Sequence, residues 1–71
     1  MTQQDRVLAY LQRNGTITQA EALRDLGCAR LGARIYELKH AGHRITTSMI
    51  PVMNRYGEWS HVARYRLHAE D

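Results

Sequence analysis

Apolar residues recur three to four positions apart through the first part of the chain, which is the spacing of helices with one buried face. The first such helix is expected to begin after Thr2, since Thr2 and Asp5 have the spacing of an N-cap with an acid in the first turn. Gly15 is expected to end it, because glycine adopts the left-handed conformation after a helix at little cost. Its buried face comprises Val7, Leu8 and Leu11.

A second, shorter helix is expected from about Gln19 to Leu26. Thr18 and Glu21 have the spacing of a capping box at its start, and Gly27 is placed to end it. Thr16 and Ile17 precede it as a brief extended link. The residues expected to turn inward are Ala22, Leu23 and Leu26.

A third helix is expected to begin near Cys28 or Ala29 and to continue to about Ala41, before Gly42. Its buried stripe is Leu31, Ile35 and Leu38. The opposite side has Ala29, Arg30, Ala33, Tyr36, Glu37 and His40, with Arg34 and Lys39 on the flanks. Gly32 inside a helix costs about 1 kcal/mol relative to alanine, so either a close backbone approach or a later helix start must explain it.

After Gly42 the pattern changes to β-branched and alternating residues, which is typical of strands. Two strands joined by a turn at residues 54–57 are the simplest interpretation, because asparagine and glycine tolerate positive φ. In the second strand Ala63, Tyr65 and Leu67 are expected to face the helices, and Val62, Arg64 and Arg66 to face away. Pro51 lacks a backbone donor, which indicates an edge strand or a bulge.

Length and composition limit the function classes. We expect 71 residues to form one domain, residues 1–71, with a frayed tail at 69–71 and no room for a deep catalytic cleft. One cysteine excludes an internal disulfide, and no apolar run approaches the roughly 18 residues of a membrane span, so we expect a complete cytosolic protein. No catalytic signature is present, so we expect neither an enzyme nor a cofactor.

A metal site is not expected either. The residues that could ligate a metal lack the paired spacing of a structural zinc site; they are Cys28, His40, His43, His61 and His68. Cys28 is interpreted as a small buried residue.

The positive charge lies in the second half of the chain. The net charge is +3, and residues 1–28 contribute three basic and three acidic side chains, which cancel. Residues 29–68 contribute seven basic side chains against Glu37 and Glu58, an excess of five. Nine of the ten basic residues are arginine, whose planar fork suits phosphate oxygens and guanine edges.

The order helix, link, helix, helix, strand, turn, strand resembles the winged helix-turn-helix domain over nearly the whole chain. The segment RLGARIYELKHAGHRI, the turn NRYG and the closing VARYRL are similar to those of small helix-turn-helix proteins of bacteriophages and prophages. The resemblance implies an α+β fold, in which a three-helix bundle with a helix-turn-helix is followed by a C-terminal β-hairpin, the wing. It also implies double-stranded DNA as the partner, with the third helix in the major groove.

The resemblance further implies two groups of contacts. Candidates for base contacts are Ala29, Arg30, Ala33, Tyr36, Glu37 and His40. Arg30 is the first choice for a guanine, with phosphate contact as its alternative, whereas Glu37 is expected either to accept from a cytosine or to pair with Arg34 or Arg30. Candidates for phosphate or wing contacts are Thr18, Gln19, Arg34, Lys39, Arg44, Asn54, Arg55, Tyr56, Arg64 and Arg66.

Several of these residues also have a structural interpretation. We favour turn formation for Asn54 and a packing lid for Tyr56. We expect Trp59 and Tyr65 to pack in the core or against the wing, with stacking on a nucleobase as the alternative. Arg64 and Arg66 are expected to fix the register on phosphates rather than to recognise sequence.

Two functions are consistent with this pattern. The first is sequence-specific DNA binding by a small transcriptional regulator or by an accessory factor of a phage or mobile element, in the bacterial cytoplasm or nucleoid. The alternative is a phage-encoded protein-interaction domain that binds or inhibits a host protein or nucleoprotein complex. The apolar run Met49, Ile50, Val52 and Met53 motivates the alternative, and a homodimer seam is the simpler explanation of that run.

Overall fold

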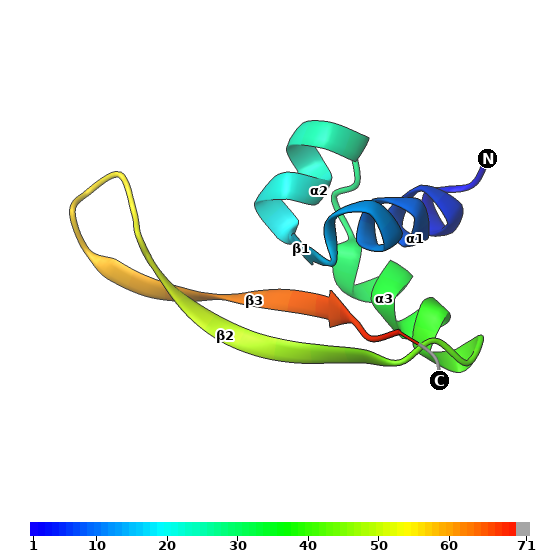
Figure 1. Ribbon diagram of the computed structural model, residues 1–71. Coiled ribbons are helices and arrows are strands. Elements are labelled where there is room, and N and C mark those ends of the chain that lie inside the picture. Colours follow the sequence, from blue (N-terminus) through cyan, green and yellow to red (C-terminus); the bar gives the residue numbers. More distant parts are fainter. Residues whose placement is uncertain (70–71) are drawn as a thin grey trace.

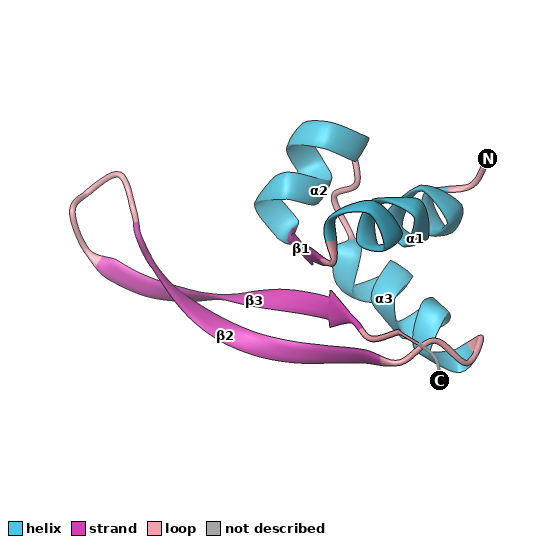
Figure 2. Ribbon diagram, in the orientation of Figure 1, coloured by secondary structure: helices cyan, strands magenta, loops and turns pink. Residues whose placement is uncertain are grey.

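The computed structural model describes residues 1–69, in which three helices form one layer and a three-stranded antiparallel sheet forms another (Figure 1). The elements are α1 (Gln3–Asn14), β1 (Thr16–Thr18), α2 (Gln19–Leu26), α3 (Leu31–His40), β2 (Ile45–Met53) and β3 (Trp59–Leu67). The hairpin of β2 and β3 extends well beyond the helices (Figure 2). The expected α+β class is confirmed, and the frayed tail expected at 69–71 lies, except for Ala69, outside the described residues.

Local capping determines where the first two helices begin and end, as the sequence predicts. The Thr2 side chain accepts from the backbone N–H of Asp5, and the Asp5 carboxylate accepts from Thr2 in return. Thr18 and Glu21 form the same reciprocal capping box at the start of α2. Gly27 ends α2 in the left-handed conformation, with φ of 65°.

The third helix begins later than the sequence predicts. We expected a start near Cys28 or Ala29, but the first helical residue is Leu31, and Arg30 at the N-cap position makes no capping hydrogen bond. The Gln19 side chain provides the cap instead. Its amide oxygen accepts from the Leu31 N–H at 3.1 Å, and its amide nitrogen donates to the carbonyl of Cys28 at 2.7 Å.

The sheet has the order β1-β3-β2, so the short link at residues 16–18 is a strand of the sheet. Ile17 lies opposite Tyr65, and Ile45 lies opposite Leu67. Because directly opposed residues share a face, these four side chains lie on one face, which packs against the helices and is called here the inner face. The alternating residues form the outer face. Pro51 lies in β2, an edge strand, as expected.

The core gathers side chains from all three helices and from the inner face of the sheet. Its buried members are Val7, Tyr10, Leu11, Ile17, Ala22, Cys28, Leu31, Ile35, Leu38 and Ile45. The expected stripe of α3 and the burial of Cys28 are therefore confirmed. The inward orientation predicted for Leu23 is wrong, since its side chain is exposed. Leu23 lies about 100° around α2 from the buried Ala22, whereas Leu26 lies about 40° from it and packs against the core.

A hydrogen bond joins α1 to α2 at the edge of this core. The Tyr10 hydroxyl donates to the Asp25 carboxylate at 3.1 Å, and Arg24 pairs with the same carboxylate. Burial of the ring and this hydrogen bond raise the pKa of Tyr10, whereas the hydrogen bond from Arg24 lowers the pKa of Asp25. The carboxylate therefore remains ionised at neutral pH.

Within residues 1–69, no helix combines the length and apolar character needed to cross a membrane.

The cap provided by Gln19 leads to a stability prediction. Gln19→Ala removes one acceptor from the Leu31 N–H and one donor from the Cys28 carbonyl, so it should lower the free energy of unfolding by about 1–2 kcal/mol. Chemical denaturation followed by circular dichroism measures the change. Gln12→Ala on the exposed side of α1 is the control and should leave stability nearly unchanged. Equal stability of the two variants would contradict the capping role.

Candidate nucleic-acid interface

The exposed side of α3 presents polar and aromatic side chains. Tyr36, Glu37 and His40 are exposed, and Ala33 beside them is partly buried. The rings of Tyr36 and His40, one turn apart, lie with centroids 4.2 Å apart and planes tilted by 48°. This face offers hydrogen-bonding groups and flat surfaces, which suit contact with the edges of bases in a groove.

Arg30 lies immediately before this helix rather than within it. It is exposed, and its guanidinium forms no ion pair or hydrogen bond with the described part of the chain. Ala29 next to it is also exposed and also precedes the helix. The interpretation of both as helical residues is therefore wrong, because the cap by Gln19 sets the start at Leu31. The free Arg30 nevertheless extends from the N-terminal end of α3.

Glu37 pairs with Arg34, which was one of the two roles expected for it. The Arg34 Nε lies 2.8 Å from the Glu37 carboxylate, and the two residues are one helical turn apart. The pair neutralises the one acid on this face and partly occupies Arg34. Lys39 and Arg44 are exposed and form no ion pair among residues 1–69, so their charges are available to an anion.

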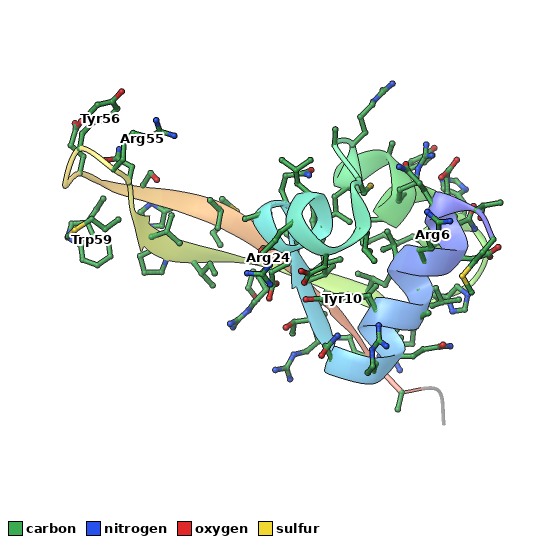
Figure 3. All side chains as sticks on the ribbon, turned by 90° about the horizontal axis from the view of Figure 1, so that it is seen from above. Arg6, Tyr10, Arg24, Arg55, Tyr56 and Trp59 are labelled. Carbon is green, nitrogen blue, oxygen red and sulfur yellow. The ribbon has the colours of Figure 1, made fainter. Side chains whose placement is uncertain are left out.

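The tip of the hairpin is built by Asn54 and presents Arg55 and Tyr56. The Asn54 side-chain oxygen accepts from the backbone N–H groups of Tyr56 and Glu58 at 2.9 and 3.0 Å, which confirms its role in the turn. The packing lid predicted for Tyr56 is wrong, because its side chain is 78% exposed. Figure 3 shows Arg55 and Tyr56 pointing to one side of the tip and Trp59 pointing to the other.

Arg64 and Arg66 lie on the outer face of the sheet, opposite to the helices, as the alternation in β3 predicts. They therefore point away from the start of α3, where Gly32 lies over the Tyr65 hydroxyl on the inner side. Thr46 and Ser48 of β2, which were not among the expected contact residues, lie directly opposite Arg66 and Arg64. The polar run at residues 46–48 in a strand was a signal for an exposed face, but only the register shows which arginine Thr46 and Ser48 each flank.

Thr18 and Gln19 are occupied by internal hydrogen bonds. The Thr18 hydroxyl takes part in the capping box, and the Gln19 amide bridges to Cys28 and Leu31. The Glu21 carboxylate sits at the same helix start, at 2.9 Å from the Thr18 nitrogen. Its negative charge disfavours a phosphate there, so both residues support the interface from within.

The apolar run of β2 is divided between the two faces of the hairpin. Met49 and Met53 lie on the inner face and are 61% and 56% exposed, whereas Ile50 and Val52 lie on the outer face and are half-buried. Trp59 lies opposite Met53 and is 67% exposed, so a place for it in the core is wrong, because the hairpin tip extends beyond the helices. Tyr65 does pack against the core, as expected.

The described residues contain no cluster of three side chains suited to hold a metal ion. His68 lies 2.7 Å from the hydroxyl of Thr46.

A comparison with protein-family models relates this arrangement to known proteins. The model described as "Winged helix-turn-helix domain" matches residues 2–70, almost the entire chain. The chain belongs to the winged helix-turn-helix family. Within this family α2 and α3 form the helix-turn-helix, and the hairpin of β2 and β3 is the wing. No curated protein and no solved structure matches the chain significantly.

Membership of the winged helix-turn-helix family indicates DNA binding in general. Such a domain places its second helix-turn-helix helix, here α3, in the major groove of DNA. The free Arg30 and the exposed side of α3 are the part of this chain that the fold would present there. The assignment of individual residues to bases or phosphates stays a prediction.

Gly32 is the second residue of α3, so the late start of the helix, and not a close backbone approach, explains why a glycine is found within it. The helix starts late, and a Cβ added to Gly32 would meet only the Tyr65 hydroxyl, at 3.9 Å, an ordinary contact distance. Its φ is not in the positive range. The structure therefore leaves room for a side chain at this position.

Replacing Gly32 by alanine should therefore stabilise the protein. The free energy of unfolding should rise by about 0.5–1 kcal/mol, because alanine loses less backbone entropy in a helix. Gly27→Ala is the matched control and should destabilise by about 1–2 kcal/mol, since Gly27 has a positive φ of 65°. Urea denaturation compares the two. Destabilisation of both variants would show that the start of α3 is more tightly packed than the structure indicates.

Proposed function

We propose that this protein binds double-stranded DNA in a sequence-specific manner, with α3 in the major groove and the tip of the wing on the adjacent backbone or minor groove. One observation supports this most strongly. Arg30 at the start of α3 and Arg55 at the tip of the wing are both exposed and free of ion pairs with the described residues.

The roles of these residues follow from their chemistry. Arg30 can donate two hydrogen bonds to the O6 and N7 atoms of a guanine, which is the commonest specific contact in protein–DNA complexes. Tyr36 and His40 would contact neighbouring bases or thymine methyl groups, and Lys39 and Arg44 would contact phosphates. Arg55 would reach into a minor groove or bind its phosphate wall.

The biological setting is part of the proposal. The likeness of the segment from α3 to the wing to small phage and prophage proteins favours a transcriptional regulator or an accessory factor of a mobile element. Such a protein would act where the bacterial DNA lies, in the cytoplasm.

Selection from a random duplex library tests the proposal directly. The protein should enrich a short defined site, and its affinity should fall steeply with salt. About four phosphate contacts would give a slope of roughly −3 to −4 in a plot of log affinity against log salt concentration, measured by fluorescence anisotropy. Absence of duplex binding even at low salt would refute DNA binding by this chain.

The selected site then tests Arg30. Arg30→Ala should reduce discrimination between the preferred base and its alternatives by roughly 5- to 150-fold, equivalent to about 1–3 kcal/mol. Arg6→Ala is the matched control, because Arg6 is an exposed arginine on α1, away from the wing (Figure 3). Discrimination should be unchanged in that variant. An equal loss of affinity for selected and random duplexes in Arg30→Ala would assign Arg30 to phosphate instead.

The second candidate function is protein binding through the wing. Met49, Met53 and Trp59 are each more than half exposed on one face of the hairpin, which is unusual for large apolar side chains without a partner. A homodimer seam would cover them, and so would a host protein or a nucleoprotein complex. The structure divides the apolar run, so Ile50 and Val52 would not belong to that seam.

Light scattering distinguishes the two partners. A homodimer through this face should appear at twice the chain mass and should dissociate in Met53→Ser, because that substitution removes an apolar contact next to Trp59. Ile50→Ser on the outer face is the control and should leave the mass unchanged. A monomer at all concentrations would exclude the homodimer and leave a different protein as the partner.

A further inference from the structure

Two rows of polar side chains cross all three strands on the outer face of the sheet. The strand register places the members of each row directly opposite one another. One row consists of Thr16, Arg66 and Thr46, and the other consists of Thr18, Arg64 and Ser48. Each arginine is thus flanked on both sides by a hydroxyl-bearing side chain. The Thr18 hydroxyl is engaged by Glu21 and the Thr46 hydroxyl lies 2.7 Å from His68, so Thr16 and Ser48 provide the hydroxyls that stay open to a ligand among the described residues.

This face has positive charge without a compensating acid in its strands. Arg64 and Arg66 are exposed, and neither forms an ion pair within residues 1–69. The sequences of β1, β2 and β3 contain no aspartate or glutamate. At one edge of this face the Glu21 carboxylate accepts from the Thr18 hydroxyl, so the phosphate site centres on Arg64, Arg66, Thr16 and Ser48.

The chemistry of the rows matches a phosphate backbone. Arginine and hydroxyl side chains are among the common donors to phosphate oxygens in nucleic-acid complexes. Arg64 and Arg66 are two residues apart in β3, so their Cα atoms lie about 7 Å apart along the strand. That separation allows the two guanidinium groups to contact neighbouring phosphates of one strand. The rows offer no apolar pocket for a base, so this contact would not depend on sequence.

The outer face of the sheet and the start of α3 lie on opposite sides of β3. The helices pack on the inner face, where Ile17 is fully buried opposite Tyr65. Gly32 at the start of α3 lies over the Tyr65 hydroxyl on that same inner side. The sheet therefore separates the start of α3 from Arg64 and Arg66.

We propose that the outer face of the sheet binds the phosphate backbone of a second DNA duplex, so that one copy of the chain bridges two duplexes. This inference rests on the proposed function for the first duplex, which α3 and the wing tip hold. The second contact is sequence-independent and depends on Arg64 and Arg66.

A co-capture experiment tests the bridge. One duplex with the selected site is immobilised on beads through biotin, and a second, fluorescent duplex of random sequence is added with the protein. The full chain should retain the fluorescent duplex on the beads. The double variant R64Q/R66Q should lower this retention by about tenfold or more, because two phosphate contacts are lost. Its affinity for the selected duplex alone, from anisotropy, should change by less than about threefold.

The control variant is R6Q/R13Q, which removes two exposed arginines from α1 and the same total charge. It should retain the fluorescent duplex like the unmodified protein. An unchanged thermal midpoint in both double variants shows that they fold.

The other outcomes overturn the inference in distinguishable ways. Binding of the selected duplex without any co-capture leaves the proposed function standing and refutes the bridge. A loss of single-duplex affinity in R64Q/R66Q equal to its loss of co-capture assigns both arginines to the first duplex. Co-capture that persists in R64Q/R66Q attributes bridging to a dimer with two α3 surfaces. No binding of either duplex refutes the proposed function itself.

Discussion

The pairing of the three-residue strand β1 with the end of β3 is the constraint on which the rest of this structure depends. Ile17 is fully buried opposite Tyr65, so β1 holds the sheet against the helices. Thr18 ends this strand and also caps α2. The direction of the helix-turn-helix relative to the wing is therefore set within a few residues, and a change at Ile17 would disturb both.

The same pairing divides the basic residues into two surfaces. It places Tyr65 under the start of α3 and, by the alternation of the strand, turns Arg64 and Arg66 to the opposite face. The basic residues of the second half of the sequence are thus divided between Arg30 at the start of α3 and Arg55 at the wing tip, on the one hand, and Arg64 and Arg66 on the outer face of the sheet, on the other. This separation is the physical basis for assigning them to different duplexes.

At the start of α3, one residue stabilises the helix and another is free to contact a ligand. Gln19 caps Leu31 from a distance of twelve residues in the chain, which frees Arg30 from any structural role within the described residues. Arg34 is partly engaged by Glu37, which limits its reach. Arg30, which has no partner among the described residues, is therefore better placed than Arg34 to contact DNA.

The sequence by itself determined the features that depend on neighbours within one turn. Capping by Thr2 and Thr18, helix ends at Gly15 and Gly27, and the turn at Asn54 all arise from hydrogen bonds or φ angles within a few residues. The α+β class and the alternation of the strands followed from the same local patterns, as did the core stripe of α3. Such features are predictable because their partners are close in sequence.

Only the tertiary structure decided the features that depend on distant partners. The start of α3 depends on Gln19, and residues 16–18 become a strand only because β3 returns beside them. Trp59 remains exposed because the hairpin is longer than the helical layer it leaves (Figure 1). The strand register likewise separated Arg64 from Arg30. Each of these features depends on contacts between residues far apart in the sequence, which the local spacing of apolar and polar residues does not specify.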